Sequence, residues 1–95
     1  MGVDLRGVPT VLLPDTGSDD DYVYRAFAPA LHAVGAVPIP HAPRPAGLIA
    51  GYLEALQDAS RDRPIAIAGV SLGAAVAAAW AIAHPGQTVA VLAAL

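Results

Sequence analysis

Two kinds of hydrophobic pattern alternate along the chain, and each predicts a different element. Short uninterrupted apolar runs that end near proline or glycine are typical of buried strands. Runs in which apolar residues recur every three or four positions are typical of amphipathic helices. The predicted strands cover Val8–Leu13, Ala36–Ile39, Ile65–Ala68 and Thr88–Leu92.

Helical spacing occurs in the three segments between these strands. The first segment runs from Tyr22 to about Val34, and Gly35 is a natural stop for a helix. Pro29 lies inside it and removes one backbone hydrogen bond, so a kink or a two-part helix is an open alternative. The other two helices are expected over Leu48–Leu56 and Leu72–Ala83.

The alternation of nearly continuous apolar strands with helices predicts an α/β fold. We expect a parallel sheet of about four strands with helices on both faces, joined by right-handed crossovers. A chain of 95 residues suits one small domain, so residues 1–95 are expected to form a single unit.

Composition and charge exclude several classes of protein. With 56% hydrophobic and 14% charged residues, the chain is not a disordered tail. A net charge of -3 argues against nucleic-acid binding, which needs a clustered basic surface. The absence of cysteine excludes disulfides, thiolate zinc sites and cysteine nucleophiles. No motif indicates a cofactor, and we expect none.

Two segments of the sequence bear on export and membrane insertion. Met1–Arg6 has no apolar segment behind it, so no signal peptide is visible and a cytoplasmic protein is expected. Ile65–Ala83 is 19 residues long and carries no charge, about the length that spans a bilayer. A buried strand followed by a buried helix explains the same residues better, and a membrane span stays the alternative.

The strongest chemical signal is Gly69-Val70-Ser71-Leu72-Gly73, a G-x-S-x-G pentapeptide between a predicted strand and a predicted helix. A tight turn there projects the Ser71 side chain from the sheet, and the two glycines avoid Cβ clashes. The helix N-terminus supplies a positive field and a free N–H at Leu72. Both would stabilise the oxyanion formed when Ser71 attacks a carbonyl carbon.

Two other interpretations of the pentapeptide are weaker. Ser71 would only cap the following helix, with Gly69 and Gly73 permitting close packing. Alternatively, the turn would bind phosphate, but a dinucleotide site needs glycine at the position of Ser71 and an acidic residue about 20 positions later. Neither is present.

In this setting, Gly69–Gly73 resembles the nucleophile elbow of the α/β-hydrolase superfamily. Leu12–Asp19 resembles the oxyanion loop of that family, which usually contains His-Gly, a variable residue and Gly. Pro14 and Asp15 stand where His and the first Gly are usual. The resemblance implies that the backbone N–H groups of Thr16 and Leu72 form the oxyanion hole.

The resemblance covers nearly the whole chain but only the N-terminal portion of the family fold. It implies strands three to six of the family sheet, in the spatial order 4-3-5-6. In the family, the acid and the histidine of the catalytic triad follow later strands, and so would lie beyond Leu95. We therefore expect weak or no turnover from the 95 residues alone.

The implied function is a serine hydrolase, similar to carboxylesterases and thioesterases, that acts on a small-molecule acyl substrate. Ser71 would form an acyl-enzyme with an ester or thioester carbonyl, and water would release it. An acyltransferase has the same elbow. A third hypothesis is a non-catalytic hydrolase module that associates with itself through the exposed edge of its last strand.

None of the three histidines is well placed to serve as the catalytic base that takes the proton of Ser71. His84 lies at the far end of the helix that follows Ser71, roughly 20 Å away, and is expected to cap that helix. His32 is expected on the wrong side of the sheet. His41 follows a strand at the same edge as Ser71; it would be a solvated loop residue or, less favourably, the base.

The remaining polar and aromatic candidates have structural explanations. Asp19-Asp20-Asp21 is expected to cap a helix, with Ser18 or Asp19 as the capping residue, rather than to bind a metal ion. Trp80 is expected in the core rather than as a platform for substrate. The sequence predicts that the arginines on either side of Pro64, Arg61 and Arg63, are solvated.

Overall fold

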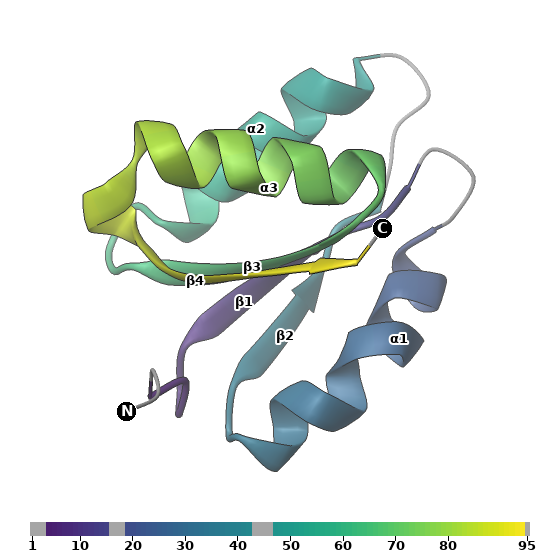
Figure 1. Ribbon diagram of the computed structural model, residues 1–95, viewed down its shortest axis with the longest axis vertical. Helices are drawn as coiled ribbons and strands as arrows, with labels where there is room; N and C mark the ends of the chain where they lie inside the picture. Colours follow the sequence, from purple (N-terminus) through teal and green to yellow (C-terminus); the bar gives the residue numbers. More distant parts are fainter. Residues whose placement is uncertain (1–3, 16–18, 43–46, 95) are drawn as a thin grey trace.

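The computed structural model describes residues 4–15, 19–42 and 47–94 (Figure 1). The strands are β1 (Pro9–Leu13), β2 (Val37–Pro40), β3 (Ile65–Val70) and β4 (Thr88–Ala94). The helices are α1 (Asp20–Ala33), α2 (Leu48–Ala59), α3 (Leu72–Ala83) and the short 3-10 helix η1 (Pro85–Gln87). Every predicted strand and helix is therefore present, with ends that differ from the prediction by a few residues.

All strand pairs are parallel, and the order across the sheet is β2-β1-β3-β4. This confirms the predicted α/β fold, and the order is the one implied by the hydrolase resemblance. The carboxyl ends of the strands meet at one edge of the sheet, on the right in Figure 1. At this edge Leu13 of β1 lies beside Gly69 of β3.

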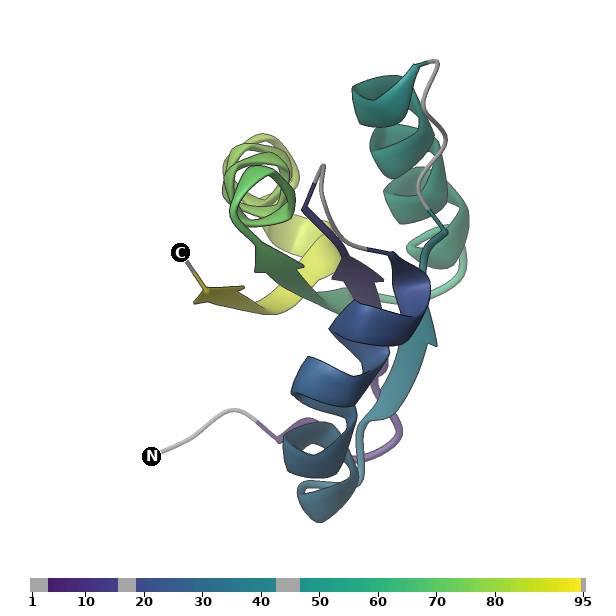
Figure 2. The same ribbon diagram turned by 90° about the vertical axis from the view of Figure 1, so that its right-hand side faces the viewer.

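Helices cover both faces of the sheet, as predicted. α2 and α3 lie on one face and α1 lies on the other (Figures 1 and 2). Because side chains alternate along a strand, Val11 and Leu13 of β1 face α2 and α3, whereas Leu12 faces α1. The near absence of polar residues from the strands follows from this burial on both faces.

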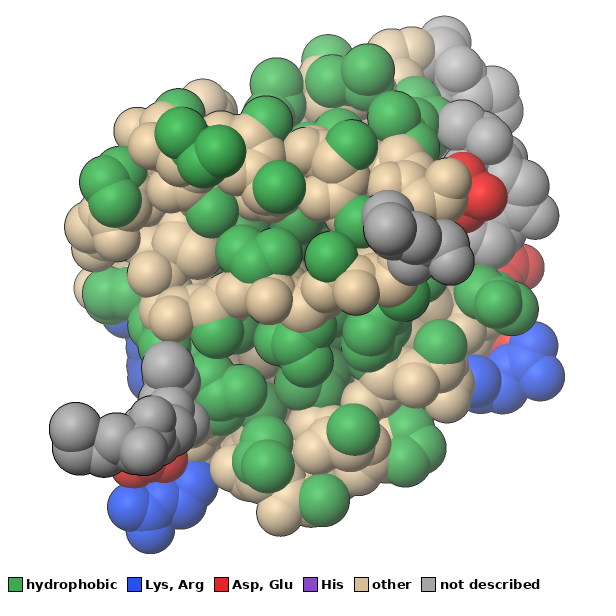
Figure 3. Space-filling view, viewed as in Figure 1, with side chains coloured by type: hydrophobic (Ala, Val, Ile, Leu, Met, Phe, Trp, Pro, Cys, Tyr) green, Lys and Arg blue, Asp and Glu red, His purple; other side chains and the backbone are tan. Residues whose placement is uncertain are grey.

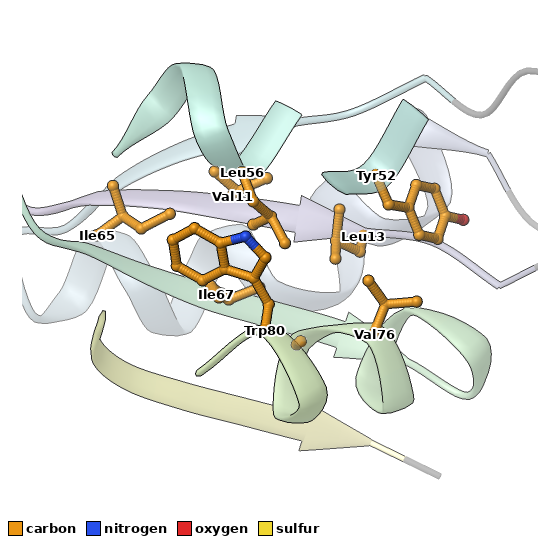
Figure 4. Close-up of a cluster of buried hydrophobic side chains, with 9 residues drawn as sticks. Val11, Leu13, Tyr52, Leu56, Ile65, Ile67, Val76 and Trp80 are labelled. Carbon is orange, nitrogen blue, oxygen red and sulfur yellow. The ribbon is translucent and has the colours of Figure 1, made fainter. Parts of the chain in front are cut away.

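The larger hydrophobic cluster lies between the sheet and the pair α2 and α3 (Figure 4). Trp80 is 3% exposed and fills the space between the two helices and the strands, which confirms its predicted place in the core. The buried members of this cluster are Val11, Leu13, Tyr52, Leu56, Ile65, Ile67, Val76, Ala77 and Trp80.

The smaller cluster lies under α1 and contains Leu12, Val23, Leu31, Ala36 and Ala68. Its helix begins where the acidic run predicts: the carboxylate of Asp19 accepts a hydrogen bond from the backbone N–H of Tyr22 at 2.8 Å. Ser18, the other predicted cap, lies outside the described residues.

α1 continues through Pro29 as a single element, so the alternative of a two-part helix is wrong. Pro29 cannot donate to the carbonyl of Arg25 one turn earlier. Both residues lie on the exposed side of α1, where a carbonyl without a helical partner costs less than in the core, and the helix continues without a break.

The charge-free stretch from residue 65 to residue 83 is divided into β3 and α3, with Ser71 between them. Within the described ranges, no helix is both long enough and apolar enough to cross a bilayer. The interpretation of this stretch as a buried strand followed by a buried helix is confirmed.

Candidate active site

Ser71 forms the corner between β3 and α3 and has an unusual backbone conformation. Its φ of 53° and ψ of -110° make it the sole non-glycine residue with positive φ in the described parts of the chain. Such a conformation costs about 1–3 kcal/mol and persists only where the surrounding structure imposes it. The side chain of Ser71 is exposed at the carboxyl edge of the sheet.

The two glycines of the elbow (Gly69–Gly73) are required by close contact between backbones. A Cβ on Gly69 would lie 2.6 Å from the Ala74 nitrogen and closer still to the Gly73 carbonyl. A Cβ on Gly73 would lie 2.8 Å from the carbonyl carbon of Leu13. Real Cβ atoms essentially never approach other atoms this closely. The glycines therefore let α3 start directly against β3 and β1.

The capping interpretation of Ser71 is wrong. Ser71 occupies the N-cap position of α3, but its side chain makes no hydrogen bond to the first turn of that helix. A capping serine normally has extended φ and ψ, which direct its oxygen toward the N–H groups of the helix. At φ 53° the hydroxyl is instead left exposed at the corner.

The backbone N–H groups of Ser71 and Leu72 differ in their hydrogen bonding. The Ser71 N–H donates to the carbonyl of Ala94 at 2.8 Å, which ties the elbow to the end of β4. The Ser71 carbonyl accepts from the N–H of Ala75 at 3.1 Å. Leu72 is the first residue of α3, so its N–H has no acceptor within the helix. This amide, at the positive end of the helix dipole, is suited to binding an oxyanion.

The loop after β1 begins directly beside the elbow. Leu13 pairs with Gly69, and the next residue, Pro14, is fully buried. The hydroxyl of Tyr52, from α2, donates a hydrogen bond to the Pro14 carbonyl oxygen. Thr16, the other predicted oxyanion donor, lies outside the described residues.

The sequence pattern did not predict that Tyr52 lies at this edge of the sheet. It indicated only that Tyr52 belongs to the apolar stripe of the helix over Leu48–Leu56. Burial, and to a smaller extent the negative charge of Asp15, raise the pKa of Tyr52 above its ordinary value of 10.0. A tyrosine within a buried stripe indicates a hydrogen bond to another segment, because a buried hydroxyl normally finds a partner.

His41 is not the solvated loop residue that was expected. Its N–H donates to the Leu12 carbonyl at 3.1 Å, and its ring packs edge-on against Tyr52 with centroids 5.4 Å apart. The imidazole Nε2 is buried beside Gly51 of α2. Contact with α2 draws this ring inward, and the composition of the loop does not reveal that contact.

The other two histidines lie as expected. His84 is the C-cap residue of α3, its ring stacks on Trp80 at 4.2 Å, and its Nδ1 lies 3.0 Å from the Trp80 carbonyl oxygen. His32 is exposed in the last turn of α1, with its ring 6.3 Å from that of Tyr24. Helix α3 separates His84 from the elbow, and His32 belongs to the helix on the opposite face of the sheet.

Charged residues elsewhere form local surface pairs. Asp21 pairs with Arg25 at 3.0 Å on α1, and Arg61 pairs with Asp58 at 2.6 Å. Arg63 is exposed and donates to the Gly7 carbonyl at 3.0 Å. In the described segments, no group of three or more His, Asp or Glu residues is arranged to hold a metal ion.

The fold thus brings together an exposed serine hydroxyl, a helix-terminal amide at Leu72 and the start of the β1–α1 loop. Comparison of the chain with protein-family models, curated proteins and solved structures gave no match.

Proposed function

We propose that the protein is a serine hydrolase of the α/β-hydrolase type, with Ser71 as the nucleophile and an ester or thioester as substrate. The observation that carries the proposal is the conformation of Ser71. A positive φ at a serine, exposed between a buried strand and a helix, is a local strain that packing alone does not explain. A nucleophile elbow explains it.

Two further features support the proposal. Gly69 and Gly73 permit the close approach that an elbow needs, and the strand order β2-β1-β3-β4 agrees with the hydrolase resemblance. The loop that corresponds to the family's oxyanion loop starts beside the elbow, at Pro14. These features come from three separate parts of the chain.

The proposed reaction has two steps. The Ser71 Oγ attacks the carbonyl carbon of the substrate and gives up its proton to a base, and the carbonyl oxygen becomes an oxyanion that accepts from the Leu72 N–H. The C–O or C–S bond to the leaving group then breaks, the leaving group takes the proton, and an acyl-enzyme remains. Water attacks this ester and releases the acid and free Ser71.

The base and the acid that orients it are not assigned to residues 1–95. The resemblance places them after later strands of the family sheet, so we expect these 95 residues alone to turn substrate over weakly or not at all. Removal of single triad members from related machinery leaves a residual catalysis of about 10³–10⁴-fold over water, which comes from the oxyanion hole and binding. A covalent probe is therefore a better test than turnover.

The test is reaction with a fluorophosphonate, followed by mass mapping of the modified peptide. We expect slow phosphonylation at Ser71 in the folded wild type, because the exposed hydroxyl at the corner and the Leu72 amide act without the missing base, and none in Ser71→Ala. Ser60→Ala is the matched control, because Ser60 is a buried serine at the end of α2, outside the elbow. Equal labelling of heat-unfolded protein, or no labelling at Ser71, would contradict the proposal.

Hydrolase and acyltransferase differ only in the group that attacks the acyl-enzyme. The protein acylated with an activated ester is mixed with water alone or with an added alcohol or thiol. If the acyl group leaves Ser71 at the same rate with and without the acceptor, the protein is a hydrolase. If the acyl group is transferred to the acceptor, the protein is an acyltransferase.

Self-association through β4 is a second candidate function, favoured by one observation. In the described part of the sheet β4 pairs only with β3, and Thr88–Ala94 contains no charged residue and no proline to discourage pairing. Hydrophobic side chains gather along the side of the molecule where β4 lies (Figure 3). Two copies would pair along their β4 edges about a twofold axis.

Light scattering after gel filtration tests this association. We expect a dimer for the wild type, a monomer for Ala93→Lys, which places a charge on an exposed position of β4, and a dimer for Ala79→Lys on α3. A wild type that is monomeric at every concentration would contradict it.

A further inference from the structure

Tyr52 joins the hydrophobic core to the edge of the sheet that carries Ser71. Its side chain is fully buried in the cluster between α2, α3 and the sheet. Figure 4 shows its ring among the hydrophobic side chains and its hydroxyl directed out of the cluster, away from Trp80. The hydroxyl donates to the carbonyl oxygen of Pro14, the residue that follows β1.

The hydrogen bond from Tyr52 acts on the backbone that supports the elbow. Pro14 is joined to Leu13, whose carbonyl group lies against Gly73 so closely that no Cβ fits between them. Gly73 is in turn joined to Leu72, the first residue of α3. Tyr52 therefore holds one side of a backbone contact whose other side carries the proposed oxyanion donor.

Other contacts keep the phenol in one orientation. The ring of His41 packs edge-on against it at 5.4 Å and lies 83° from parallel, so the ring has an aromatic neighbour as well as the core. The Pro14 carbonyl only accepts, so Tyr52 is the donor and must remain protonated. Burial and the charge of Asp15, which raise the pKa of Tyr52, favour that protonated form.

We propose that Tyr52 is a positioning residue for the Ser71 site: its hydrogen bond to Pro14 fixes the end of β1 against Gly73 and thereby places the Leu72 amide for oxyanion binding. The inference rests on the proposed function. It concerns orientation alone, because Tyr52 reaches the site only through Pro14, Leu13 and Gly73.

Tyr52→Phe tests the inference, because phenylalanine keeps the ring and removes the donor. The control is Leu56→Val, one turn further along α2 in the same cluster, which perturbs packing and no hydrogen bond. Phosphonylation of Ser71 is measured over a range of fluorophosphonate concentrations, which separates the maximal rate from the half-saturating concentration. In parallel, the amide ¹⁵N shift of Asp15 reports on the Pro14 carbonyl to which it is bonded.

For Tyr52→Phe we expect a maximal rate about tenfold lower, because misplacement of a site by less than 1 Å costs this order of rate. The half-saturating concentration should not change, and the Asp15 amide shift should move. Leu56→Val should keep the maximal rate of the wild type. A purely structural role would lower the melting temperature of both variants and would leave the maximal rate of both unchanged below that temperature.

Three results would overturn the inference, and they are distinguishable. A wild type without labelling at Ser71 removes the proposed function and the inference with it. A labelled wild type with equal maximal rates in wild type and Tyr52→Phe removes the inference alone. If Tyr52→Phe is unfolded in buffer, the variants are compared in trimethylamine N-oxide, which favours the folded state. If Tyr52→Phe does not fold in that osmolyte either, Tyr52 is required for folding and the inference is overturned.

Discussion

Replacement of Gly73 by alanine is the sharpest test of the elbow geometry. The added Cβ would lie 2.8 Å from the Leu13 carbonyl carbon, whereas ordinary contact begins at 3.4 Å. The Leu13 carbonyl oxygen is closer still to the added Cβ, so the backbones of α3 and β1 must separate by at least about 0.6 Å. No flexible side chain absorbs this movement, because the opposing atoms belong to a buried strand that pairs on both sides.

The expected loss of stability follows from two opposing effects. Overpacking in a rigid core costs about 1–3 kcal/mol and occasionally more, and a clash between two backbones belongs at the upper end of that range. Alanine is favoured over glycine within a helix by at most about 1 kcal/mol. We therefore expect the free energy of unfolding to fall by about 2 kcal/mol, which lowers the Tm of a domain of this size by about 10 °C.

Urea unfolding followed by fluorescence measures this change, since Trp80 is the single tryptophan and is buried. Gly86→Ala is the matched control, because a Cβ there meets no atom within 4 Å and its φ is not in the left-handed region. That variant should stay within about 0.5 kcal/mol of the wild type. If Gly73→Ala is as stable as Gly86→Ala, the close contact between α3 and β1 does not exist and the elbow geometry is wrong.

Three further predictions concern the cap, the strained serine and the buried phenol. Asp19→Ala should lower the free energy of unfolding by about 1 kcal/mol in urea melts, because it removes the N-cap bond of α1, and Asp20→Ala should have a smaller effect. Ser71→Gly should be about 1 kcal/mol more stable than Ser71→Ala, because glycine accepts a φ of 53° without strain; equal stabilities would show that the corner is unstrained. Because the folded state raises the pKa of Tyr52, its stabilising effect is complete below pH 10.0 and disappears as the pH rises through the folded pKa. Alkaline melts of Tyr52→Phe should therefore depend less steeply on pH than those of the wild type, and equal pH dependence in the two proteins would contradict the reasoning.

The arrangement of strands and helices was predictable because it depends on patterns along the chain. A strand buried on both faces must be apolar throughout, as Ile65–Val70 is, and its parallel neighbours require helical crossovers. Right-handed crossovers leave few possible topologies. The cap at Asp19 was predictable for the same reason, because a helix start is a local event.

The placement of Ser71 was also predictable, since a corner between a strand and a helix is built from adjacent residues. The spacing of Gly69 and Gly73 around Ser71 already indicated that two backbones approach closely there. The sequence did not indicate that the partner of Gly73 is the Leu13 carbonyl, 60 positions earlier in the chain. That contact depends on β1 and β3 being neighbours in the sheet.

The pattern of the chain by itself thus determined the elements, their parallel pairing and the serine corner, because each follows from residues close in sequence. Only the tertiary structure decided the surroundings of that corner: the inward packing of His41, the hydrogen bond from Tyr52 to Pro14 and the tie from Ser71 to Ala94. These contacts join segments that lie far apart along the chain. Their partners are selected by the packing of helices on a twisted sheet, and no local pattern encodes that packing.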